Sequence, residues 1–245
     1  MKTSSLGILS IALIALGLCA PDAATAQTLS GHTGRATAWH GQVAPETTYS
    51  IDDGTAENGV GLTNGGSFIA LNSFAVTPGN NIITSISIAF GTPLFPEPTL
   101  NGLAYTAVLW SDPNGDGSPT DAVVLASQSG VVSGASTNTF DVSLITPTVV
   151  LTPNFFVGFA ITHVAGQHPA AFDQTAPLPN RSYITIGSNI NDLSAASPIE
   201  VITGGGLVGN WMIRADTVPE PQSWAIFAFG AMMLIGVRRL LRRSV

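Results

Sequence analysis

Cysteine and lysine are almost absent from this chain of 245 residues. The only cysteine is Cys19 and the only lysine is Lys2, so both lie within the first 26 residues. If that segment is removed on export, as argued below, the remaining chain can form no disulfide and offers no thiol nucleophile. Its stability must then come from packing, with bound ions as a further source.

The sequence also lacks the common catalytic motifs. It has no Gly-x-Ser-x-Gly elbow, no His-Glu-x-x-His helix and no phosphate-binding glycine loop. These absences exclude the enzyme classes that are most easily recognised from sequence motifs. The four histidines form two loose pairs without helical ligand spacing, which favours loop or surface positions: His32 and His40, His163 and His168. We therefore expect a protein that is not an enzyme.

Basic residues are scarce between the two ends of the chain. Residues 27–217 contain three arginines against 13 acids, a formal charge of −10. Binding of nucleic acid requires clustered Lys and Arg, so nucleic acid is excluded as a partner. A scattered acidic surface favours solubility, and it can also collect divalent cations.

What the sequence does contain is a three-part C-terminal segment, residues 218–245. Val218, Pro219, Glu220 and Pro221 come first, and an apolar run over residues 224–237 follows. Four arginines lie beyond that run: Arg238, Arg239, Arg242 and Arg243. This order of elements at the extreme C-terminus resembles the PEP-CTERM sorting signal of exported bacterial proteins.

The resemblance implies a processing partner and a destination. Proteins with this signal are substrates of an exosortase, an integral-membrane cysteine protease, and most are extracellular or associated with exopolysaccharide. The arginines would act as a membrane stop, and the positive-inside rule places everything before Val218 outside the cell. The apolar run has 14 residues, fewer than the ~20 that span a bilayer, although Leu240 and Leu241 extend it. An ordinary permanent membrane anchor is the alternative.

The N-terminus predicts export in the same orientation. Lys2, an apolar stretch over residues 6–18 and the small residues Ala24-Thr25-Ala26 form the three parts of a secretory signal peptide, residues 1–26. Cys19 leaves lipidation as an alternative, although the bulky Leu18 precedes it. We expect an extended arm over residues 27–48 and one folded domain over residues 49–217.

Apolar residues of the expected domain alternate with period two, which predicts β-strands. Alternation is clearest at Phe155, Val157, Phe159 and Ile161, at Ile86, Ile88 and Phe90, and at Phe140, Val142 and Leu144. Residues 105–110, 122–126, 181–186 and 211–215 are further candidates. Many short strands separated by Gly, Pro and Asn predict an all-β protein, a single jelly-roll-like β-sandwich.

One loop has the pattern of a calcium site. Asp112, Asn114 and Asp116, followed by Gly117, match the Asp-x-Asn-x-Asp-Gly opening of calcium loops, in which alternate oxygen ligands converge on a hard cation. The position of the bidentate Glu is Val123 instead, so Asp121 or backbone carbonyls would have to complete the shell. A metal-free turn is the alternative, because the same residues are typical of hairpin loops.

We therefore expect an exported protein of the cell surface or extracellular matrix with a structural or adhesive role. A secreted carbohydrate-binding module is an alternative if the aromatic rings are exposed: Trp39, Trp110, Tyr183 and Trp211. The competing interpretation is that Trp110 and Trp211 fill the core of the sandwich. A secreted hydrolase would need paired carboxylates, for which Asp52, Asp53 and Glu57, or Asp112 and Asp116, are nominal candidates.

Overall fold

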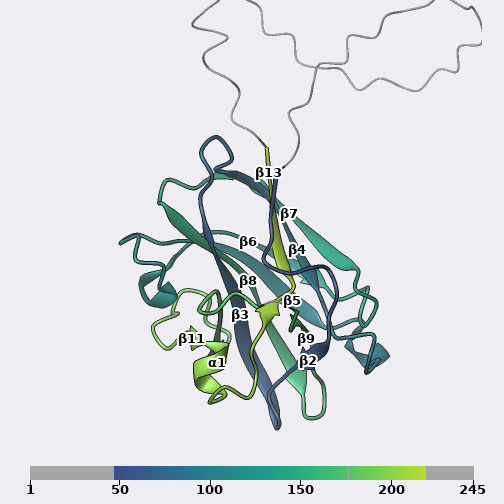
Figure 1. The fold of residues 1–245 in the computed structure, drawn as a ribbon. Helices are drawn as coiled ribbons and strands as arrows, with labels where there is room; N and C mark the ends of the chain where they lie inside the picture. The colour runs from purple at the N-terminus through teal and green to yellow at the C-terminus, as the bar shows by residue number, and fades with distance from the viewer. Residues whose placement is uncertain (1–46, 176, 219–245) are drawn as a thin grey trace, which may run out of the picture. The chain divides into compact units, whose positions relative to one another are not determined.

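The computed structural model describes residues 47–175 and 177–218, and these residues form an almost entirely β structure (Figure 1). Every strand pairing is antiparallel, and the one α-helix is the short α1, Ile199–Ile202. The prediction of an all-β protein is confirmed. The signal peptide and the sorting helix predicted from the sequence lie outside the described residues. Within them, no helix is long and apolar enough to span a bilayer.

Three sheets make up the described structure. The four-stranded sheet has the order β1 (Thr47–Tyr49), β13 (Ile213–Val218), β4 (Ile82–Ala89), β7 (Phe140–Val149). The six-stranded sheet has the order β11 (Ser197–Pro198), β10 (Ser182–Ile186), β3 (Gly65–Ala75), β8 (Asn154–Val164), β5 (Ala104–Ser111), β6 (Val123–Val131). A small sheet contains β12 (Asn210–Trp211), β9 (Ala170–Asp173) and β2 (Asn58–Val60). Two 3₁₀ turns, Pro98–Leu100 and Pro119–Asp121, lie in the connecting loops.

The main core lies between the two larger sheets. Their inward-facing residues form one buried apolar cluster, to which β8 contributes all four residues of its predicted apolar face, Phe155, Val157, Phe159 and Ile161. The opposite sheet contributes Ile86 and Ile88, and Phe90 follows directly after β4. Alternation in the sequence therefore identified the core-facing side of β4 and β8 correctly, because a strand directs every second side chain to the same face.

The second face of the six-stranded sheet is covered as well. Ile69, Trp110 and Phe156 form a separate buried cluster there, packed with Leu193 from the segment after β10. The indole nitrogen of Trp110 donates a hydrogen bond of 2.8 Å to the carbonyl oxygen of Ile190, which ties that segment to the sheet. The central strands β3, β5 and β8 are consequently buried on both faces.

β7 has the reverse orientation. Val142 and Leu144, on the face that alternation marks as apolar, are 58% and 74% exposed, while Ser143 and Ile145 point inward. The hydroxyl groups of Ser143 and Tyr105 lie 3.1 Å apart in a buried hydrogen bond between the two sheets. Hydrogen bonding thus accommodates a polar residue in the core, and the apolar side chains face solvent.

A buried polar network joins the sheets. The side-chain amide of Asn72 on β3 donates to the carbonyl oxygens of Trp211 (2.8 Å) and Ile213 (3.2 Å). Its oxygen accepts a 2.7 Å hydrogen bond from the hydroxyl of Ser182, which itself accepts from the backbone N–H of Trp211 at 3.1 Å. Because Asn72 is fully buried, this network fixes the approach of β12 and β13 to the six-stranded sheet.

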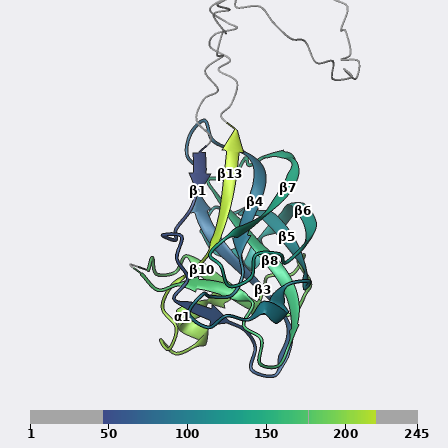
Figure 2. The same ribbon diagram turned by 90° about the vertical axis from the view of Figure 1, so that its right-hand side faces the viewer.

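The two ends of the described domain are neighbours. Thr47 of β1 pairs with Thr217 of β13, and β13 pairs in turn with β4. Figure 2 shows β1, β13 and β4 side by side, with β13 directed toward one end of the molecule. Val218, the last described residue, ends β13 and pairs with Ile82.

Candidate functional site

The predicted calcium loop follows β5 directly, and Asp112 organises it. This side chain is fully buried and accepts backbone hydrogen bonds from Gly115 (3.0 Å) and Gly117 (2.8 Å). The side-chain amide of Asn154 donates to the same carboxylate at 3.3 Å and to the carbonyl oxygen of Gly115 at 3.0 Å. Gly115 and Gly117 have φ values of 74° and 80°, which glycine adopts without strain.

Three carboxylates converge at this loop. Asp112, Asp116 and Asp121 each offer an oxygen, and these atoms lie within 4.8 Å of one another. Asp121 belongs to the 3₁₀ turn Pro119–Asp121, which returns the chain toward the loop before β6 begins. Hard cations such as Ca²⁺ take carboxylate oxygens at this kind of spacing. Both polar atoms of the Asn114 side chain bond to Asp116: the oxygen accepts from the backbone N–H of Asp116 at 2.9 Å, and the amide donates to Oδ2 of Asp116 at 3.1 Å.

A second acidic group joins distant parts of the chain. Asp53, Glu57 and Asp173 also offer carboxylate oxygens within 4.8 Å of one another. Asp53 and Glu57 precede β2, and Asp173 ends β9; the two strands pair so that Asn58 lies opposite Phe172. Sequence reasoning named Asp53 and Glu57 but missed Asp173, because no local pattern shows which strand lies beside β2.

Asp173 is the buried member of this group. Its carboxylate accepts hydrogen bonds of 2.7 Å from the backbone N–H groups of Asp53 and Thr175. Burial raises the pKa of Asp173 above 3.8, and these two bonds oppose the shift only in part. The nearby carboxylates of Asp53 and Glu57 raise the pKa of Asp173 further.

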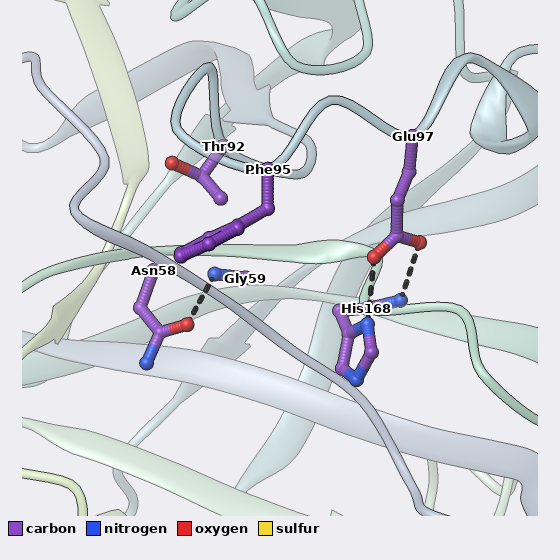
Figure 3. Close-up of a pocket in the computed structure, with 6 residues that line it drawn as sticks. All are labelled: Asn58, Gly59, Thr92, Phe95, Glu97 and His168. Atoms are coloured by element: carbon purple, nitrogen blue, oxygen red, sulfur yellow. Dashed lines mark hydrogen bonds and ion pairs between the residues drawn. The ribbon is translucent and has the colours of Figure 1, made fainter.

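A shallow pocket of about 250 Å³ lies beside the small sheet (Figure 3). Its walls include Asn58 of β2, the exposed ring of Phe95 and an ion pair between Glu97 and His168 at 2.6 Å. The ring of Phe95 lies between Thr92 and Asn58, and both carboxylate oxygens of Glu97 face His168 (Figure 3).

The histidines separate into different roles. His163 is buried, its Nε2 accepts from the backbone N–H of Leu62 at 3.0 Å, and its Nδ1 lies 2.9 Å from the carbonyl oxygen of Val164. The neutral tautomer with the proton on Nδ1 satisfies both contacts, so His163 supports the fold. His168 is half exposed at the pocket. His32 and His40 lie outside the described residues.

The two tryptophans of the strands, Trp110 and Trp211, fill the core, as one of the two interpretations of the sequence predicted. Trp110 and Trp211 are fully buried, and Tyr183 is buried with its hydroxyl bonded to the carbonyl oxygens of Gly117 and Asn180. None of these three rings is available for stacking on a sugar. Trp39 lies outside the described residues, as do Pro219, Glu220, Pro221 and the four arginines of the predicted sorting signal.

Comparison with known proteins yields a likeness of fold. No family model matches the chain, and no curated protein matches it. Among solved structures, the chain is similar to the clostridial cysteine protease Cwp84 after propeptide cleavage, with 15% identity and a TM-score of 0.51. That match covers 71% of this chain and 40% of Cwp84. A structure of the cysteine protease and lectin-like domains of Cwp84, a surface layer associated protein of Clostridium difficile, matches at 16% identity and a TM-score of 0.45, over 63% of this chain and 32% of that one.

These matches do not transfer an activity. The chain spans less than half the length of these two solved structures. At 15% identity, the first of them indicates a similar fold only. The described residues contain no cysteine. The thiol chemistry of a cysteine protease therefore has no counterpart among them.

Proposed function

We propose that this chain is an exported, non-catalytic protein with a structural or adhesive role at the cell surface or in the extracellular matrix. The observation that carries the proposal is the three-part segment at residues 218–245, combined with the secretory pattern of residues 1–26. In this proposal an exosortase-type protease recognises Val218 to Pro221, after the apolar run and the arginines have held the chain in the membrane. The folded part is a jelly-roll-like β-sandwich.

The arrangement of the domain supports this proposal. β13 is held in its sheet between β1 and β4, and it ends at Val218, one residue before Pro219. The Pro219-Glu220-Pro221 motif that a processing enzyme would recognise therefore follows directly after a strand that is paired on both sides. The surface is also acidic and without lysine, which favours solubility outside the cell and disfavours adhesion to anionic lipid.

The decisive measurement is the intact mass of the mature protein isolated from its native cells, together with its C-terminal peptide. We expect a chain that ends within residues 218–221, and added mass there would identify what it is attached to. A Glu220→Gln variant should accumulate unprocessed, while the matched Asp192→Asn variant should be processed normally. A mature chain that retains Arg242 and Arg243 would contradict the proposal and establish a permanent anchor.

A carbohydrate-binding role is the second candidate, and the pocket at Phe95 is the observation that favours it. Phe95 is 67% exposed beside Asn58 and Glu97, whereas the strand tryptophans are buried. Titration with soluble exopolysaccharide fragments, followed by NMR of the backbone amides of the pocket residues Asn58, Gly59 and His168, tests this role. Shifts that disappear in Phe95→Ala but persist in the control Leu94→Ala would support it, and unchanged spectra would exclude it.

A further inference from the structure

β6 is an edge of the six-stranded sheet, and β7 of the other large sheet lies beside its last residues without pairing with it. β6 pairs with β5 on one side, and among the described residues no strand pairs with its other side. Its nine residues, Val123–Val131, include no charged residue and no proline, and none of its side chains is fully buried. A row of backbone N–H and C=O groups along such an edge is a template for another strand.

The other sheet edges are short or interrupted. β1 has three residues and β11 has two, one of which is Pro198. β7 is long, but it carries Asp141 and Pro147. In the small sheet, β2 has three residues and β12 has two. Proline, charge and short length are the devices by which natural sheets discourage pairing with other chains, and β6 has none of them.

A register shift limits the part of β6 that can pair with another strand. The ladder between β5 and β6 shifts register at Leu109 and Trp110, which leaves Leu125 without an opposite residue. From Ala126 to Val131 the pairing is regular. This stretch contains small neutral side chains, Ala126, Ser127, Ser129 and Gly130, over which a second backbone can approach. A groove of about 600 Å³ separates residues 128–131 from residues 140–144 of β7.

Charge indicates which partner this edge accepts. The domain has a formal charge of −10 over residues 27–217, so two copies repel each other over most of their surfaces. β6 itself carries no charge, so pairing along it places no like charges directly opposite each other; Asp141 of β7, which lines the groove beside it, accepts hydrogen bonds from the backbone N–H and hydroxyl of Ser133. An antiparallel pair of identical strands around a two-fold axis also matches each backbone donor row with its own acceptor row.

We propose that two copies of this protein associate through β6, antiparallel around a two-fold axis, and so extend the six-stranded sheet into a continuous sheet across both. The inference goes beyond the proposed function and does not depend on it, because it follows from the sheet edge alone. It gives the domain a means of assembly that uses backbone hydrogen bonds and requires neither cysteine nor metal.

Sedimentation velocity of the mature protein, isolated from its native cells, tests the proposal. We expect a dimer whose dissociation constant rises about tenfold or more in Ser127→Lys, because symmetry places the two lysines near each other. The matched control Thr146→Lys places the same charge on the exposed outer face of β7 and should leave the dimer unchanged. All three proteins carry the same C-terminus, so association through a retained tail would be equal in all three and would overturn the proposal.

The single-cysteine variants Ser127→Cys, Gln128→Cys and Ser129→Cys provide an independent readout. In a two-fold antiparallel pair only one residue lies opposite its own copy, and pairing over most of the regular stretch Ala126–Val131 places that residue near the middle of the stretch. One of the three variants should therefore cross-link under mild oxidation much faster than the other two. Thr146→Cys on β7 is the control. A protein that stays monomeric, or cross-linking no faster at these positions than at 146, would overturn the proposal. Cross-linking needs only the folded domain, so its outcome is separate from that of tail processing.

Discussion

Arg214 and Asp52 form an ion pair between residues that are 162 positions apart in sequence. Nε of Arg214 lies 3.0 Å and 3.2 Å from the two carboxylate oxygens, and Nη2 also contacts Oδ1. The guanidinium group is 4.3 Å from the centre of the Phe140 ring. The ion pair holds the segment before β2 against β13. The Asp52 side chain is fully buried, and the Arg214 side chain is 26% exposed.

Loss of Arg214 should therefore destabilise the protein strongly. Arg214→Met leaves the buried carboxylate of Asp52 without its charged partner, and we expect a loss of about 3 kcal/mol in the free energy of unfolding. Arg181→Met is the control, because Arg181 forms no ion pair among the described residues, and it should change stability by about 0.5 kcal/mol or less. Urea denaturation measures both. Equal losses would show that the ion pair contributes nothing specific.

The Asn72 network should be just as sensitive. Asn72→Ala leaves the carbonyl oxygens of Trp211 and Ile213 and the hydroxyl of Ser182 without their buried partner. We expect a loss of about 2–3 kcal/mol in the free energy of unfolding. Asn191→Ala, at an exposed loop position, should be nearly neutral. If the two variants unfold at the same urea concentration, the network does not hold the sheets together.

Calcium should stabilise the domain if the Asp112 loop binds it. A ligand bound only by the folded state at 100 times its dissociation constant adds about 2.7 kcal/mol, so the melting temperature should rise with added calcium and fall with chelator. Asp116→Asn and Asp121→Asn should each abolish the rise, and Asp192→Asn should retain it. Asp112 is unsuitable for this test because its carboxylate also holds Gly115 and Gly117. No rise at millimolar calcium, or a rise that persists in Asp116→Asn, would leave the metal-free turn as the correct interpretation.

Asp173 should titrate above, and Asp192 below, the usual aspartate pKa of 3.8. Burial raises the pKa of Asp173 above 3.8, whereas hydrogen bonds from the hydroxyl and backbone N–H of Ser194 lower the pKa of Asp192. Because the folded chain holds the Asp173 proton more tightly than the unfolded chain, its contribution to stability falls as pH rises from 3.8 through the folded-state pKa and is level above it. Carboxyl ¹³C shifts recorded across acidic pH measure both groups. Coincident titration curves would contradict the assigned environments.

The presence of β-strands could be predicted from the sequence, whereas the face that a strand turns to the core could not always be predicted. The alternation over residues 155–161 correctly identified the face of β8 that packs in the main core, because the residues that this face meets on the opposite sheet are apolar. The same alternation in β7 marks a face on which Val142 and Leu144 are exposed. β7 is an edge strand, and the hydrogen bond between Ser143 and Tyr105 directs its polar side inward.

The candidate sites divide in the same way. The Asp112 loop is local, and its Asp, Asn and Gly spacing was visible in the sequence, whereas Asp121 was only one of several ways to complete it. Asp173 joins Asp53 and Glu57 through the pairing of β2 with β9, and that pairing depends on contacts between residues more than 100 positions apart. No periodicity or motif encodes such a pairing.

The sequence by itself determined that the protein is all-β, and it supplies the evidence for export, because strand periodicity and terminal sorting patterns are properties of neighbouring residues. Only the tertiary structure decided the strand order, the burial of Trp110 and Trp211, the pairing of Arg214 with Asp52 and the position of β6 at an open edge. These features depend on which distant segments come together. Side-chain packing and backbone hydrogen bonding across the whole domain select those partners, and no single stretch of residues specifies them.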